Sequence, residues 1–237
     1  GKKIVLHESD AIPGLANKFL SKLTKNIAIA FDGASKFFPQ KNIFMVGNPV
    51  RLKYLGLTRQ EAEDILEFPS DNQVIFISGG SQGAQKINEV IIKSLNKLLK
   101  DYDIIWSVGS NNYQNIKELT GEKSHLKLSA LLSERELAAA YSLCGLAIGR
   151  AGAGTIFEMA AFGKPSILVP LERKGGDQPF NAMAYADTGA SIILNESELS
   201  PETLIEAINT ILSSQSVIEN MKENAEKFAK INAGEEV

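Results

Sequence analysis

The alternation of strand and helix patterns along this chain restricts its fold more than any other feature. Short apolar runs predict strands over residues 2–7, 26–31, 42–47, 74–78, 103–108, 126–130, 146–148, 166–169 and 191–194. Helical patterns fall between them, over residues 13–23, 58–68, 84–100, 111–120, 133–144, a stretch ending at Gly163, 178–188, 201–213 and 216–231. Such alternation indicates parallel strands joined by crossover helices, a doubly wound α/β sheet. Because ligands of these sheets bind outside the carboxyl ends of the strands, the loops after strands hold the candidate residues.

Length and composition are those of a globular chain. The 237 residues suffice for one large domain or two smaller ones, and the single cysteine, Cys144, suits a reducing cytoplasm. No apolar run approaches the roughly 20 residues that cross a bilayer. Since no Cys/His cluster occurs, and the DxD of residues 101–103 falls at the wrong end of its strand, we predict no bound metal or cofactor. A strand begins almost at Gly1, so we expect a piece of a longer protein.

The charge is unevenly distributed along the chain. Residues 1–53 hold nine Lys or Arg against three Asp or Glu, a net +6, which leaves −9 on the remainder of a chain whose total is −3. A basic segment on an acidic body is typical of a protein that meets an anionic surface or substrate. Lysines that are simply solvated would give the same count, and the sequence leaves both interpretations open.

Two glycine-rich turns each follow a predicted strand and precede a predicted helix. The first is ISGGSQGAQKIN at residues 77–88, and the second is GRAGAGTIFE at residues 149–158. Glycine lets the backbone turn tightly and approach a ligand closely, and the helix that follows presents its positive end. Neither turn matches GxxxxGK[ST] or GxGxxG, which disfavours a P-loop and a dinucleotide site. One such turn is usually only a connection, whereas two in one sheet favour a phosphate ligand.

Several side chains near these turns have both a structural and a functional interpretation. Thr155-x-x-Glu158 has the spacing of a capping box, but Glu158 could instead accept hydrogen bonds from a ribose. Arg51 and Arg150 could neutralise a diphosphate or form surface ion pairs. Asp177 could be an N-cap, while Gln178 and Asn181 could read sugar hydroxyls. His7 and Glu8 follow at the carboxyl end of the first strand, where active-site residues sit.

Four motifs, in order, resemble the bacterial peptidoglycan N-acetylglucosaminyltransferases of glycosyltransferase family 28. They are HESDAIPGLANK (7–18), GNPVR (47–51), GGSQGA (79–84) and RAGAGTIFEMAAFGKPSILVPL (150–171) with DQPFNA (177–182). The resemblance implies a two-domain α/β fold of the GT-B type, truncated at its N-terminus. Residues 1–50 would end the acceptor domain, residues 51–214 would form a complete Rossmann-like donor domain, and residues 215–237 would pack back toward the first domain.

The resemblance also assigns site residues. The donor-binding set is Arg51, Ser81, Gln82, Gly83, Asn88, Arg150, Gly152, Gly154, Thr155, Glu158, Gln178 and Asn181. His7 and Glu8 are the catalytic candidates, and Asp10 lies on the sugar and acceptor side. The family often has Gln-Asn where this chain has Ser9-Asp10, and a second Gln where it has Asp177.

The implied reaction moves N-acetylglucosamine from UDP-N-acetylglucosamine to the C4 hydroxyl of the muramyl sugar of lipid I, with inversion, to give lipid II for cell-wall growth, cell shape and division. The implied partners are that donor, an undecaprenyl-diphosphate-linked muramyl-peptide acceptor and the anionic inner membrane surface in the bacterial cytoplasm, with no nucleic acid. Two alternatives stay open: a donor-binding domain that is inactive without a separate acceptor-binding half, and a UDP-sugar epimerase of similar fold. An NAD-dependent oxidoreductase is disfavoured because GxGxxG is missing.

Overall fold

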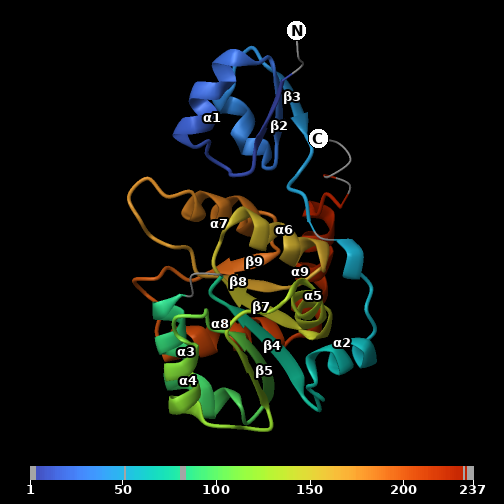
Figure 1. Cartoon of the computed structure of the whole chain (residues 1–237), viewed down its shortest axis with the longest axis vertical. Helices are drawn as coiled ribbons and strands as arrows, with labels where there is room; N and C mark the ends of the chain where they lie inside the picture. Colours follow the sequence, from blue (N-terminus) through green and yellow to red (C-terminus); the bar gives the residue numbers. More distant parts are fainter. Residues whose placement is uncertain (1–3, 51, 81–83, 232, 234–237) are drawn as a thin grey trace.

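The computed structural model describes residues 4–50, 52–80, 84–231 and 233, arranged as two lobes (Figure 1). We call residues 4–46 the small lobe and residues 58–231 the large lobe. The small lobe has a parallel sheet of order β1-β2-β3, made of β1 (Val5–Glu8), β2 (Asn26–Ile29) and β3 (Asn42–Met45). Its helical segments are α1 (Leu15–Leu20) and the 3-10 turns at Ser21–Leu23 and Asp32–Phe37. The domain boundaries predicted at residues 50 and 214 stay predictions.

The large lobe is built on a six-stranded parallel sheet of order β6-β5-β4-β7-β8-β9. Its strands are β4 (Gln73–Ser78), β5 (Tyr102–Ser107), β6 (Leu126–Ser129), β7 (Leu146–Gly149), β8 (Ser166–Leu168) and β9 (Ser191–Ile193). Its helices are α2 (Arg59–Leu66), α3 (Gln85–Leu98), α4 (Tyr113–Thr120), α5 (Glu134–Leu143), α6 (Ala153–Ala161), α7 (Gln178–Ala186), α8 (Pro201–Leu212) and α9 (Gln215–Phe228). The chain runs outward from β4 to β6, returns to the middle at β7 and runs outward again, which is the doubly wound order.

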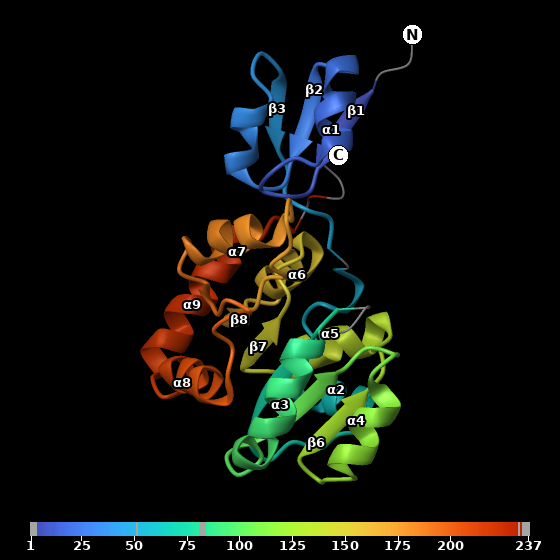
Figure 2. The same ribbon diagram turned by 90° about the vertical axis from the view of Figure 1, so that its left-hand side faces the viewer.

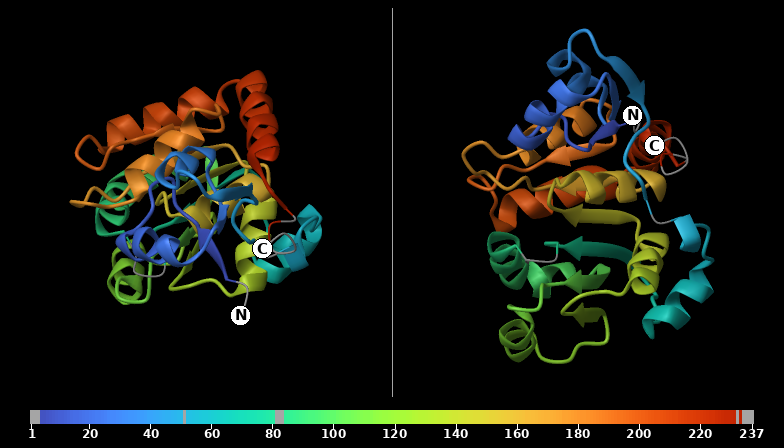
Figure 3. Two further views of the ribbon diagram at one scale, coloured as in Figure 1. Left: turned by 90° about the horizontal axis from the view of Figure 1, so that it is seen from above. Right: turned by 45° about the horizontal axis from the view of Figure 1, so that its top comes forward.

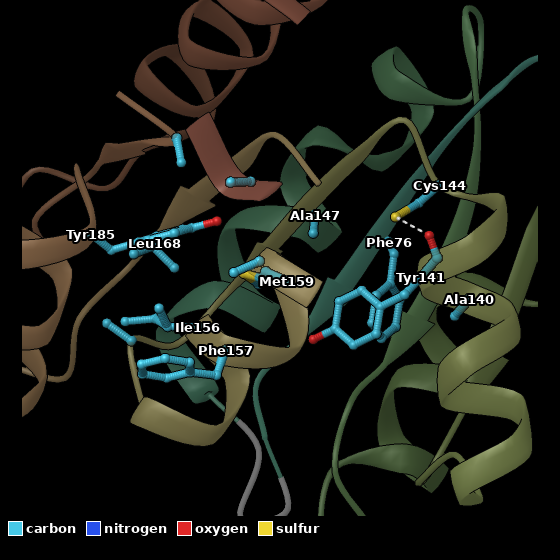
Figure 4. Close-up of a cluster of buried hydrophobic side chains, with 14 of the residues drawn as sticks. Phe76, Ala140, Tyr141, Cys144, Ala147, Ile156, Phe157, Met159, Leu168 and Tyr185 are labelled. Atoms are coloured by element: carbon cyan, nitrogen blue, oxygen red, sulfur yellow. Dashed lines mark hydrogen bonds between the residues drawn. The ribbon is translucent and has the colours of Figure 1, made fainter. Parts of the chain in front are cut away.

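Both faces of this sheet are buried, because successive residues of a strand point to opposite sides. In β4, Val74 and Phe76 belong to the core cluster that includes α2, α5, α6 and α7, whereas Ile75 and Ile77 belong to the cluster under α3, α4 and α8. Helices accordingly lie on both sides of the strands (Figure 3). Figure 4 shows the first cluster, in which the rings of Phe76 and Tyr141 meet edge to face at 5.1 Å.

The lobes share a buried apolar contact. Phe31, at the end of β2, packs edge to face on Phe157 of α6 at 5.3 Å and lies 5.8 Å from the ring of Phe228, the last residue of α9. Gly47, which begins the connection between the lobes, has a φ of +83°, and a Cβ there would lie 2.4 Å from the Cβ of Lys230. The segment that follows α9 therefore lies, at Lys230, beside the segment that leaves the small lobe (Figures 1 and 3).

Two helices, α1 and α9, end three residues before their predicted ends. The pattern over residues 13–23 gives only α1 and a 3-10 turn, since the Ser21 hydroxyl donates to the Lys18 carbonyl at 2.8 Å and competes with the helical ladder. The last helix ends at Phe228, because Ala229 is extended. The predicted capping box of Thr58 and Glu61 is confirmed at the start of α2.

Candidate functional site

The strand order of the large sheet reverses between β4 and β7, and both glycine turns begin at this point. The two strands are neighbours, and Ser78 at the end of β4 pairs with Gly149 at the end of β7. In open α/β sheets the crevice at such a reversal is the usual ligand site, because the two outgoing loops diverge there. The two predicted turns thus begin side by side, after Ser78 and Gly149.

The turn after β7 contains glycines with two different roles. A Cβ on Gly149 would lie 2.9 Å from the carbonyl oxygen of Ser78, so this glycine permits the close approach of β7 to β4. A Cβ on Gly152 or Gly154 would have no described atom of another segment within 4 Å. In the first turn, Gly80 has a φ of +77°, which favours glycine. The predicted site residues Ser81, Gln82 and Gly83 lie outside the described residues.

Helix starts across this sheet fall into two groups. Helix α5 follows the outer strand β6, and helix α8 follows the outer strand β9. These two helices have capping boxes, at Ser133 and Ser200. The helices after the four inner strands, α3, α4, α6 and α7, begin without a capping bond from any described side chain. The first turns of α3 and α6 also carry no acidic residue among those described. Helix N–H groups without a side-chain cap are typical of anion sites.

The capping box expected at Thr155 and Glu158 is wrong. The helix α6 begins one turn earlier, with Gly152 as its N-cap, so Thr155 already lies inside the helix. The half-buried Glu158 side chain instead lines a small hollow against α5 together with Glu134 and Tyr141. Burial and then the charge of Glu158 raise the pKa of Tyr141, which keeps that phenol neutral.

Two predicted donor-binding side chains hold strand ends in place. Arg150 donates to the carbonyl oxygen of Val169 at 3.1 Å and to Oε1 of Glu196 at 2.5 Å. The buried Asn88 donates through Nδ2 to the Val108 carbonyl at 3.0 Å and accepts at Oδ1 from the Trp106 indole at 3.2 Å. Both fix loops at the carboxyl edge of the sheet. Arg51 lies outside the described residues.

The start of α7 brings three predicted residues to the same edge. Oε1 of Gln178 accepts from the backbone N–H of Leu171 at 2.9 Å, which holds the loop after β8. Asp177 is the N-cap residue of α7, but its side chain makes no capping bond with a described atom. Asn181 is fully buried and reaches the small lobe, where Oδ1 accepts from the Ala11 N–H at 2.7 Å and Nδ2 donates to Oδ1 of Asp10 at 2.8 Å. The α6 and α7 helices face the small lobe in Figure 2.

In the small lobe, His7 and Glu8 have different surroundings. Nε2 of His7 lies 2.9 Å from the Gly47 carbonyl, which only accepts, so Nε2 carries the proton and Nδ1 of a neutral ring is left as an acceptor. Glu8 is buried, and its carboxylate accepts from the Asp10 N–H at 2.9 Å and from Nδ2 of Asn17 at 2.8 Å. Glu8 therefore holds the loop after β1, a role that its position next to His7 did not indicate.

Other groups lie away from this edge. In the described ranges, no three His, Cys, Asp or Glu side chains gather where they could hold a metal ion. Asp103 of the DxD is buried at the start of β5 and pairs with Nδ1 of His125 at 2.6 Å. A cavity of about 340 Å³, lined by Leu57, Cys144 and Lys164 among others, also lies at the amino ends of the strands. Since ligands of doubly wound sheets bind at the opposite edge, we assign the candidate site to the two turns.

The chain is similar to proteins of known name and structure. Residues 74–235 match the Glycosyltransferase family 28 C-terminal domain. The chain is 34% identical over 237 residues to the UDP-N-acetylglucosamine--N-acetylmuramyl-(pentapeptide) pyrophosphoryl-undecaprenol N-acetylglucosamine transferase of Acetivibrio thermocellus, an alignment that covers 98% of this chain and 64% of that protein. The crystal structure of Acinetobacter baumannii MurG is similar with a TM-score of 0.78 and 29% identity, covering 100% of this chain and 65% of the other. The chain thus spans just under two thirds of the length of these relatives.

A different class of protein shares the architecture. The crystal structure of the UDP-GlcNAc 2-epimerase from Neisseria meningitidis, bound to UDP-GlcNAc, has a TM-score of 0.69 and 18% identity, covering 94% of this chain and 62% of the other. Identity at this level shows a common fold alone.

Proposed function

The chain belongs to glycosyltransferase family 28, and from this premise we propose that its large lobe binds UDP-N-acetylglucosamine for transfer to the muramyl sugar of lipid I, giving lipid II. The name of the Acetivibrio relative supports the donor and the acceptor. Because the chain is shorter than that relative, transfer by this chain would need the remainder of such a protein, in the same chain or as a separate half.

One observation carries the donor site. The glycine turns after β4 and β7 lie side by side at the strand-order reversal, and each leads into a helix whose start no described side chain caps. Two helix N-termini that follow neighbouring strands favour a ligand with two adjacent negative charges, such as a nucleoside diphosphate. The same N–H groups would stabilise the charge that develops on the leaving diphosphate.

The sugar transfer also needs a base for the attacking hydroxyl. His7 is our candidate because the Gly47 carbonyl occupies Nε2 at 2.9 Å and leaves Nδ1 to accept a proton. Glu8 is a positioning residue in this proposal, since one of its oxygens accepts from the Asp10 N–H in the loop after β1 and the other from Nδ2 of Asn17 in α1. Replacing His7 with Gln would then lower kcat in the complete enzyme while leaving donor affinity unchanged.

The donor proposal is tested by calorimetry of this chain with UDP-N-acetylglucosamine, UDP-N-acetylgalactosamine, UDP and NAD. We expect selective binding of the first, weakened at least tenfold in Glu158→Gln if this carboxylate binds the ribose. The matched control is Glu134→Gln, which changes an exposed carboxylate on the same hollow. Binding of UDP with no sugar preference would favour the epimerase alternative, and binding of NAD alone would contradict the proposal.

We also propose that the small lobe contacts an anionic membrane surface at the inner face of a bacterial membrane. Within the described chain, α1 has no buried residue, and Leu15, Phe19 and Leu23 are 85%, 65% and 66% exposed. Lysines flank these side chains, and basic residues beside an apolar helix face are typical of proteins that bind anionic lipid. No helix among the described residues is both long and apolar enough to span a membrane.

Vesicle co-sedimentation tests this second proposal. Reversing the charge of Lys18, Lys22 and Lys25 should abolish binding to vesicles that contain anionic lipid, at low salt, because each lysine near the surface contributes about 1 kcal/mol. Reversal of Lys93 and Lys97 on α3 is the control. Equal binding by both variants would contradict the membrane proposal without affecting the donor site.

A further inference from the structure

One ion pair at the candidate site connects three loops of the large sheet. Arg150 directly follows β7, Val169 directly follows β8, and Glu196 lies in the loop after β9. Arg150 donates through Nη1 to the Val169 carbonyl at 3.1 Å and through Nη2 to Oε1 of Glu196 at 2.5 Å. The side chains of Arg150 and Glu196 are only 12% and 23% exposed. Two partners in different loops fix the planar guanidinium in one orientation.

This orientation directs the guanidinium away from the strand-order reversal. In the sheet, β7 has β4 on one side and β8 on the other, and β9 lies beyond β8. The two described partners of Arg150 follow β8 and β9, whereas the other glycine turn follows β4, on the opposite side of β7. A guanidinium held on this side of β7 acts on a ligand at the reversal through the backbone of the turn that Arg150 begins.

The turn after β7 is rich in glycine and needs support from outside. Gly152 is the N-cap of α6 and Gly154 lies in its first turn, and a Cβ on either would meet no described atom of another segment within 4 Å. Glycine is conformationally permissive, so ordering such a turn costs more entropy than ordering other residues. Among its described anchors are the two bonds of Arg150 and the 3.4 Å contact from Nδ2 of Asn181 to the Ala151 carbonyl.

Glu196 is itself held from the loop after β8. Oε1 of Glu172 accepts from the backbone N–H of Glu196 at 3.1 Å. Two residues further on, the exposed Glu198 accepts at Oε2 from Nδ2 of Asn195 at 3.2 Å, which is a bond within its own loop. Glu196 therefore connects to other loops through both its backbone and its carboxylate, and Glu198 offers a carboxylate of the same loop for comparison.

We propose that Glu196 is a positioning residue for the donor diphosphate, because its carboxylate holds Arg150 and Arg150 holds the glycine turn after β7. This inference rests on the proposed donor site and concerns how that site is kept ordered. It assigns Arg150 to the support of the turn instead of to the diphosphate itself. The two roles predict opposite effects of removing Glu196. A diphosphate ligand would be freed and would bind more tightly, whereas a support would lose its partner and the turn would loosen.

Calorimetry of this chain with UDP and with uridine tests the proposal, because only UDP carries the diphosphate. For Glu196→Ala we expect affinity for UDP to fall about tenfold, a typical coupling between linked sites, with affinity for uridine unchanged. Glu196→Gln keeps an oxygen that can accept from Arg150 and should lose less. Glu198→Ala is the matched control, since it also removes one negative charge. Equal or tighter UDP binding by Glu196→Ala, or an equal loss for UDP and uridine, would overturn the proposal.

Hydrogen exchange of the free chain tests the same contact without a ligand. The amide of Ile156, which donates to the Gly152 carbonyl at 3.0 Å, should exchange faster in Glu196→Ala and in Arg150→Ala than in the wild type. The double variant should exchange no faster than Arg150→Ala alone, because both changes break the same ion pair. Unchanged exchange in Glu196→Ala would contradict the positioning role. If the wild-type chain binds no UDP, the donor proposal fails, and the exchange result alone decides whether Glu196 holds the turn.

Discussion

The starts of the inner and outer helices of the large sheet differ in what satisfies their N–H groups. At the outer strands, α5 and α8 use Ser133 and Ser200, and these helices complete their hydrogen bonds within the protein. At the inner strands, α3 and α6 start from Ala84 and Gly152, with no cap from the described side chains. The difference teaches that a helix start without a cap indicates a candidate anion site when other helices of the same sheet are capped.

The largest effect should come from giving α6 a cap of its own. Gly152→Asp puts a carboxylate at the N-cap position, where a Cβ meets no described atom of another segment within 4 Å. The variant should be as stable as the wild type, because Asp is a favourable N-cap. Its charge would occupy the place of the diphosphate, and we expect donor affinity to fall roughly 100-fold, about 2.7 kcal/mol.

Calorimetry and thermal unfolding of the same samples separate the two effects. The matched control is Gly14→Asp, which adds the same side chain at the N-cap of α1, also in open surroundings. Undiminished donor binding by Gly152→Asp would mean that α6 does not face the ligand.

The next effect concerns the spacing of β4 and β7. Gly149→Ala places a methyl group 2.9 Å from the Ser78 carbonyl oxygen, so one strand must shift. Overpacking of this kind costs about 2 kcal/mol of unfolding free energy. Gly154→Ala, inside α6 and in open space, should instead stabilise by up to about 1 kcal/mol. Urea unfolding of both variants measures this, and equal stabilities would show that the approach of the strands is not tight.

A smaller effect is expected at the capped helices. Ser133→Ala removes the bond from the Glu136 N–H to the Ser133 hydroxyl, 3.3 Å in length, and should cost about 1 kcal/mol of unfolding free energy. Donor affinity should stay the same, since the N–H groups at the start of α5 bond within the protein and are not left for a ligand. Loss of donor affinity in this variant would break the distinction between the two groups of helices.

The smallest effect is a dependence on pH. Bonds from Ser133 lower the pKa of Glu136 from its ordinary value of 4.5. A carboxylate with a lowered pKa in the folded state stabilises it above the ordinary value, and this contribution is lost as the pH falls through the lowered pKa. The stability gap between wild type and Ser133→Ala should therefore narrow in acid. Thermal unfolding near pH 7 and near pH 3.5 measures this stability difference. A difference that grew in acid would contradict a lowered pKa of Glu136 in the folded protein.

Most of the fold could be predicted because apolar spacing repeats so regularly along this chain. The resemblance to family 28 and the α/β fold of the GT-B type are confirmed by the match over residues 74–235 and by the MurG structure. The Thr155–Glu158 motif misled because its spacing fits a capping box, yet the preceding glycine had already begun the helix. A local pattern does not show where the first turn starts.

The individual side-chain contacts across the lobes could not be predicted from the sequence. Ala11 and Asn181 are separated by 170 positions and meet only because the two sheets present their carboxyl edges to each other. The described bonds of Asn88 go to Trp106 and Val108, and its predicted role toward the donor stays a prediction. The roles of His7, Glu158, Gln178 and the undescribed Ser81 and Gln82 toward a ligand stay predictions.

The aromatic contact between the lobes has a mechanical consequence. Within the described residues the backbone passes between the lobes at Gly47, and the end of α9 meets the small lobe through Phe228, which packs near Phe31. These two segments are in contact with each other through Gly47 and Lys230. A sliding movement of one lobe along the other would strain the backbone at Gly47 and separate Phe228 from Phe31. A rotation about this corner would strain these contacts less. Of the two movements, we therefore expect the rotation to strain the backbone less than a sliding of the lobes.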